Sequence, residues 1–92
     1  MKRMHLTISG RVQGVYFRQS TRIKADQLGV SGWVRNRTNG SVELVAEGAI
    51  ESLNILADWC LSGPEMARVQ SVERVDEVAV GIPDGFDVRP TV

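Results

Sequence analysis

The chain has 92 residues, of which 42% are hydrophobic and 24% charged, a composition typical of one ordinary globular domain. Its eleven basic and eleven acidic residues give zero net charge, and its single cysteine, Cys60, excludes an internal disulfide and a multi-cysteine metal site. A chain of this length has room for one core, so we expect one domain over residues 1–92. It has no apolar run near the roughly 20 residues of a membrane helix and no signal-peptide core. We therefore expect the protein in the reducing cytoplasm and without a membrane partner.

The first third of the chain predicts a strand, a turn and a helix. Leu6–Ser9 alternates apolar and polar side chains, as a half-buried strand does. Gly10 and Gly14 break that pattern, and a helix is expected over residues 16–28 with Gly29 as its C-terminal cap. The apolar face of this helix consists of Phe17, Thr21, Ala25 and Leu28.

The remaining chain predicts a hairpin, a second helix and two more extended runs. Asn39-Gly40 lies between strand-like residues 30–37 and 41–47, and this dipeptide is the strongest short hairpin signal because both residues tolerate positive φ. A helix follows over residues 49–61 and is stopped by Gly63-Pro64. The Val-rich residues 68–75 then read as the last strand of the pattern, and a short run over residues 86–89 follows it.

This order of elements, βαββαβ, predicts an α+β fold of the ferredoxin-like type. Such a fold has one antiparallel sheet with both helices on one face. It does not by itself define a function, because ferredoxins, RNA-binding modules and small enzymes all use it.

The turn between the first strand and the first helix is the most informative segment. Its glycines let successive N–H groups converge at the positive end of the helix, and Arg18 adds a planar cation suited to phosphate. The alternative is an ordinary strand–helix turn with a solvated arginine, and the segment lacks the Gly-Lys-Ser/Thr ending of a nucleotide P-loop. The candidate phosphate-binding loop consists of Arg11, Val12, Gln13, Gly14, Val15, Tyr16 and Phe17.

The charges are unevenly distributed along the chain. Residues 1–40 hold eight basic side chains and one acidic, whereas residues 41–92 hold three basic and ten acidic. This asymmetry indicates that the first half handles an anion, unless the two halves intermix in space and the asymmetry cancels. Both possibilities stay open from charge alone.

A second candidate residue, Asn36, ends the strand that precedes the hairpin. Strand side chains alternate, so Asn36 faces the same way as Val34 and opposite to Arg35. Its amide offers both a donor and an acceptor, and so is able to hold a water molecule against a phosphate. The alternative is that Asn36 shapes the following turn, as asparagines near turns usually do.

The two segments together resemble the signatures of the acylphosphatase family. Gly10–Arg18 (GRVQGVYFR) resembles the first signature, and Gly32–Asn36 (GWVRN) is similar to the second; Gly63-Pro64 before Ala67–Val69 also fits. The chain departs from many members at Asn39, where they have aspartate, and at its C-terminal Pro90-Thr91-Val92.

The resemblance implies a ferredoxin-like fold and hydrolysis of carboxyl-phosphate anhydrides without metal or cofactor. It implies that Arg18 and Asn36 are the catalytic residues: Arg18 binds the phosphate and Asn36 orients the water. It also implies that residues 11–17 form the anion loop. The expected partners are a small acyl phosphate and inorganic phosphate, the product and a competitive inhibitor, with the protein a monomer that binds no nucleic acid.

The chemistry agrees with this expectation. An acyl phosphate expels a carboxylate with a conjugate-acid pKa of about 4–5, so it needs no general acid at pH 7. The remaining reactive side chains fit poorly, because Cys60 lies on an apolar helix face and His5, the single histidine, is alone on the first strand. Two alternatives remain: a non-catalytic anion- or nucleic-acid-binding module, and a regulatory domain like that of a larger carbamoyl-phosphate-processing protein.

Overall fold

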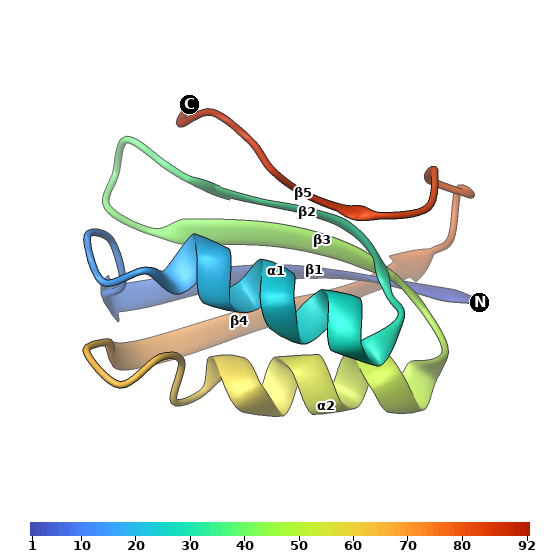
Figure 1. Ribbon diagram of the computed structural model, residues 1–92, viewed down its shortest axis with the longest axis horizontal. Helices are drawn as coiled ribbons and strands as arrows, with labels where there is room; N and C mark the ends of the chain where they lie inside the picture. The colour runs from blue at the N-terminus through green and yellow to red at the C-terminus, as the bar shows by residue number, and fades with distance from the viewer.

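The computed structural model describes all 92 residues and contains two helices and five strands. The helices are separated in sequence by a hairpin, as the expected βαββαβ order requires (Figure 1). In chain order the elements are β1 (Lys2–Arg11), α1 (Phe17–Leu28), β2 (Ser31–Asn36), β3 (Val42–Gly48), α2 (Ile50–Cys60), β4 (Arg68–Val78) and β5 (Phe86–Val88).

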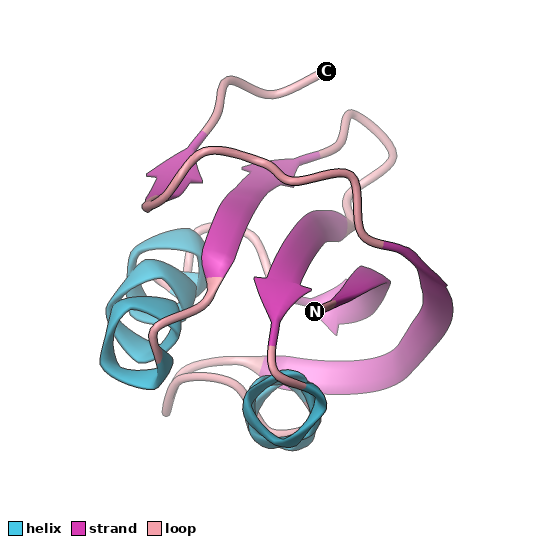
Figure 2. Cartoon of the chain, turned by 90° about the vertical axis from the view of Figure 1, so that its right-hand side faces the viewer, coloured by secondary structure: helices cyan, strands magenta, loops and turns pink.

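The strands form one sheet in the order β4-β1-β3-β2-β5, and both helices cover the same face (Figure 2). The ferredoxin-like α+β arrangement is confirmed, but the expectation of a purely antiparallel sheet is wrong. β5 runs parallel to β2, whereas all other neighbours are antiparallel. The reason is the connection through residues 79–85, which reverses the chain after β4 and carries it to the opposite edge, beside β2 (Figure 1). Neither α1 nor α2 has the length and apolar character that a membrane-spanning helix requires.

The core lies between the helices and the sheet. Met4, Leu6 and Ile8 point from β1 toward the helices and are fully buried, as the alternation in this strand predicts. Burial of each such side chain contributes about 1.5–3 kcal/mol. Phe17 opens α1 and packs at a tilt against Trp59 of α2, with ring centroids 5.6 Å apart. This contact fixes the first turn of α1, which borders the candidate site.

Cys60 is part of this core, as the sequence predicted. The thiol is fully buried, and this burial raises its pKa to about 12. The group is therefore a small apolar side chain at neutral pH rather than a nucleophile.

A buried carboxylate holds the 79–85 connection. The side chain of Glu47 is only 1% exposed and accepts hydrogen bonds from the backbone N–H groups of Val80, Gly81 and Ile82, at 2.8, 3.0 and 3.2 Å. Arg3 pairs with the same carboxylate at 3.1 Å. The hydrogen bond from the Val80 N–H has the largest effect on this carboxylate. Together the hydrogen bonds outweigh the cost of burial and lower the pKa of Glu47 to about 2.

We expect Glu47→Gln to make the protein less stable at neutral pH and less sensitive to acid than wild type. The folded pKa lies below the ordinary value of 4.5, so the stabilisation is complete above about pH 5 and is lost as the pH falls toward 2. Thermal unfolding across that range measures both effects, with a midpoint at pH 7 roughly 5 °C or more below wild type. Glu77→Gln is the matched control, because Glu77 pairs with the same Arg3 but is exposed. An equal loss in the two variants would contradict the role of Glu47.

Candidate active site

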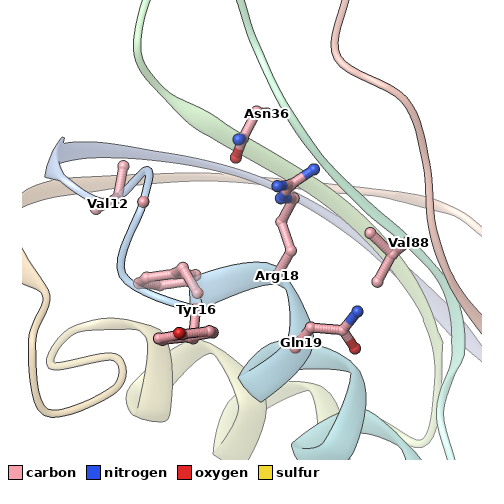
Figure 3. A pocket seen from close by; sticks show the side chains of 8 residues that line it. Val12, Tyr16, Arg18, Gln19, Asn36 and Val88 are labelled. Carbon is pink, nitrogen blue, oxygen red and sulfur yellow. The ribbon is translucent and has the colours of Figure 1, made fainter.

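A cavity of about 390 Å³ opens where β1 passes into α1. One wall is the loop before α1, with the first turn of that helix, and the other is the end of β2 with the last residue of β5 (Figure 3). Eight residues line it: Val12, Gly14, Tyr16, Phe17, Arg18, Gln19, Asn36 and Val88.

The backbone of the loop turns through two left-handed residues. Gly14 has a φ of 73° and Tyr16 a φ of 63°, and Tyr16 is the one non-glycine residue of the protein with positive φ. Just before the loop, a bulge at Gly10 redirects β1, and a Cβ there would come within 2.3 Å of the Arg68 carbonyl oxygen. These conformations fold the chain tightly from the sheet into the helix.

This fold of the loop leaves a run of backbone donors unused. The N–H groups from Val12 to Gln19 make no hydrogen bond to another backbone group. The last of them belong to the first turn of α1, where the helix dipole is positive. N–H groups without a partner at the start of a helix are suited to an anion with several acceptor oxygens.

Arg18 extends from the first turn of α1 toward Asn36 (Figure 3). By contrast, the arginines that flank Asn36 in sequence are paired on the other face of the sheet, where Arg35 and Arg37 both donate to Glu43, at 2.7 and 3.1 Å. No carboxylate lies within 4.0 Å of the Arg18 guanidinium, and its donors are therefore available to a ligand.

Asn36 faces the cavity from the end of β2, on the same side as the buried Val34, as the alternation predicts. The residue is 9% exposed, and its Oδ1 is the one buried side-chain atom without a hydrogen-bond partner. The turn is shaped instead by Asn39, whose Oδ1 accepts hydrogen bonds from the Ser41 N–H and hydroxyl, at 3.0 and 2.6 Å. The Asn36 side chain therefore takes no part in the turn, and a buried acceptor without a partner carries a cost that a bound water would remove.

The structure places the other residues of the expected loop outside the cavity lining. Arg11 ends β1 and is exposed beside Arg68, and Val15 is buried in the core. The Gln13 amide donates to the carbonyl oxygens of Arg37 and Ser41, at 2.7 and 2.9 Å, so this side chain fastens the loop to the β2–β3 turn. The three residues line no part of the cavity with their side chains.

Two lining residues, Gln19 and Val88, were not singled out from the sequence. Gln19 follows Arg18 on the exposed side of the helix, and its proximity to the arginine was the available signal. Val88 comes from β5, whose place beside β2 depends on the parallel pairing.

His5 lies on the face of the sheet that the helices leave open. Its Nε2 is 2.7 Å from a Glu43 carboxylate oxygen, and Arg35 and Arg37 bond to the same carboxylate. Partial burial opposes ionisation of Glu43, but the hydrogen bonds from His5 and the two arginines prevail and lower its pKa to about 2. His5 is thus part of a charge network away from the cavity, and no cluster of three potential metal-ligating side chains is present in the chain.

Fold and site together define a class: a small ferredoxin-like α+β domain with an anion-accepting cavity at the β1–α1 junction. The sequence profile described as Acylphosphatase matches residues 4–88. The acylphosphatase of Thiobacillus denitrificans is 53% identical over 89 residues, which are 97% of this chain and 98% of that protein. The chain therefore belongs to the acylphosphatase family, enzymes that hydrolyse acyl phosphates.

Solved structures agree with this assignment. An acylphosphatase from Coxiella burnetii superposes with a TM-score of 0.90 at 45% identity, covering 96% of this chain and 92% of that chain. The acylphosphatase from Bacillus subtilis gives a TM-score of 0.93 at 29% identity, covering 97% and 99%. The fold and the activity class thus rest on relatives of nearly the same length.

Proposed function

We propose that the enzyme hydrolyses acyl phosphates with Arg18 and the free loop N–H groups holding the phosphoryl oxygens and Asn36 orienting the attacking water. The observation that carries this assignment is the meeting, in one cavity, of an unpaired guanidinium and a buried carbonyl oxygen without a partner. The first attracts an anion, and the second accepts a hydrogen bond from water.

The reaction follows from this arrangement. The water oxygen attacks phosphorus while the bond from phosphorus to the acyl oxygen breaks, and the acyl group leaves with the electron pair as a carboxylate. The Asn36 Oδ1 accepts a hydrogen bond from the water, whose proton passes to a phosphoryl oxygen or to solvent. The carboxylate is stable at pH 7 without protonation, so positioning and charge stabilisation suffice.

Hydrolysis of benzoyl phosphate in ¹⁸O-enriched water tests the direction of attack. We expect the enzyme to place the label in inorganic phosphate and none in benzoate, because the proposed water approaches phosphorus. Mass spectrometry of both products measures this, with an enzyme-free reaction as the control. Label in benzoate would mean attack at the carbonyl carbon and would overturn the role given to Asn36.

We further propose that the reaction needs no metal or cofactor, that inorganic phosphate competes with substrate, and that residues 1–92 act as one monomeric domain. All five strands join one sheet over a single core cluster, which supports the domain assignment. We also propose a cytoplasmic location, where thiols such as that of Cys60 stay reduced.

The nucleic-acid alternative receives no support from the open face of the sheet. Its aromatic side chains are both engaged. The Trp33 ring is stacked with Arg35 and Arg89, whose guanidinium carbons lie 4.6 and 4.7 Å from the ring centroid, and the His5 ring bonds Glu43. Base recognition on such a sheet uses aromatic rings that are free to stack.

A further inference from the structure

One cavity residue, Tyr16, has a strained backbone conformation and a largely exposed side chain. Its φ of 63° lies in a region that few non-glycine residues adopt, and the residue is 80% exposed. Such a conformation is unfavourable for a residue that carries a side chain. Neither core packing nor a side-chain cap on α1 offsets this cost, so the fold alone does not explain a tyrosine here.

The geometry of displacement at phosphorus indicates what this ring faces. The attacking and leaving oxygens lie roughly in line on opposite sides of phosphorus. With the water at Asn36, the leaving acyl group extends away from Asn36. Figure 3 shows Asn36 at one end of the cavity and Tyr16 at the other, with the loop and Arg18 between them. The acyl group of a bound substrate therefore lies toward Tyr16.

We propose that Tyr16 is the acyl-group platform of the enzyme and sets a preference for planar, apolar acyl groups over small ones. The proposal rests on the phosphate and water positions of the proposed function. The exposed phenol ring offers a flat apolar surface at the mouth of the cavity, and an aroyl group stacks on it where an acetyl group makes little contact. Its substrate class is thus aroyl and similar apolar acyl phosphates.

Two substitutions separate the ring from the backbone. Tyr16→Asn removes the ring with a residue that tolerates the left-handed conformation, and Tyr16→Phe keeps the ring. The readout is the ratio of kcat/KM for benzoyl phosphate to that for acetyl phosphate. We expect Tyr16→Asn to lower this ratio about 3- to 10-fold and Tyr16→Phe to retain it. Ile23→Asn is the control: it removes an exposed apolar side chain from α1, away from the cavity, and should leave the ratio unchanged.

Binding of non-hydrolysable analogues, in which a methylene replaces the bridging oxygen, gives a second readout that is independent of turnover. Calorimetry should show the benzoyl analogue losing more affinity than the acetyl analogue in Tyr16→Asn. An unchanged ratio in this folded variant, by kinetics and by binding, would overturn the platform. Absence of turnover in wild type with a ring-dependent binding preference would instead contradict the proposed catalysis and leave the platform supported.

Discussion

Replacing Asn36 with alanine should lower kcat for benzoyl phosphate by roughly 10²–10³-fold, with a much smaller change in KM. The expected loss resembles that caused by removing one oxyanion donor, because a single positioned hydrogen bond to the reacting group is lost. The fold should tolerate this change, since the Asn36 Oδ1 has no partner in the protein and its amide shapes no turn. Steady-state kinetics on variants checked by circular dichroism measure the effect.

Asn39→Ala is the matched control for this prediction. Asn39 lies in the same hairpin, and its side chain bonds Ser41 rather than facing the cavity. We expect this substitution to cost stability, about 1 kcal/mol for a lost turn bond, and to spare turnover. Near-normal kcat in a folded Asn36→Ala variant would refute the assignment of the water-orienting role.

Replacing Arg18 with alanine should weaken both turnover and the binding of inorganic phosphate. Two charge-assisted hydrogen bonds of about 1.5–3 kcal/mol each would be lost, so kcat/KM should fall by roughly 10²–10⁴-fold. Competitive inhibition by phosphate measures the binding part, because the product shares the phosphoryl contacts of the substrate. Arg18→Lys should recover only part of the loss, since lysine keeps the charge but not the planar pair of donors.

Arg22 supplies the matched control on the same helix. It lies one turn beyond Arg18, is exposed, and is 4.0 Å from Asp26 rather than free in the cavity. Arg22→Ala should therefore leave phosphate inhibition unchanged, with a stability cost within about 0.5 kcal/mol. Equal losses in Arg18→Ala and Arg22→Ala would mean that the general positive charge of α1, and not the guanidinium of Arg18, attracts the anion.

The structure shows where the unevenly distributed charges of the two halves of the chain lie. Basic residues of the first half meet acidic residues of the second half on the open face of the sheet, where Arg35 and Arg37 bond Glu43 and Arg3 bonds Glu47. The two halves therefore do intermix, as the plainer interpretation held. Arg18 is different, because it lies in the cavity on the helix side and has no carboxylate partner. The anion is thus attracted locally rather than by the half-chain.

Local rules were sufficient for much of the fold and for the direction of Asn36. The alternation of Leu6–Ser9 indicated β1, although the strand extends over Lys2–Arg11 because pairing with both neighbours continues beyond the alternating stretch. The alternation of side chains along β2 placed Asn36 on the side of Val34, and the dipeptide Asn39-Gly40 marked the hairpin.

Contacts between distant segments could not be predicted in this way. The parallel pairing of β5 with β2, which brings Val88 to the cavity, depends on how residues 79–85 cross the sheet. That crossing is held by Glu47, and no local pattern links this carboxylate to the Val80 N–H. Likewise, the strained φ of Tyr16 follows from how tightly the loop is fastened to its neighbours, as by Gln13, and not from the residue's own preference.

Hydrolysis of benzoyl phosphate in excess EDTA tests the proposed site most directly, measured side by side for wild type, Arg18→Ala and Asn36→Ala after all three are shown to be folded. We expect rapid turnover by wild type and losses of roughly 10²-fold or more in each variant. No turnover by the folded wild type in EDTA would contradict metal-free catalysis, and near-normal turnover in either variant would contradict the site proposed here.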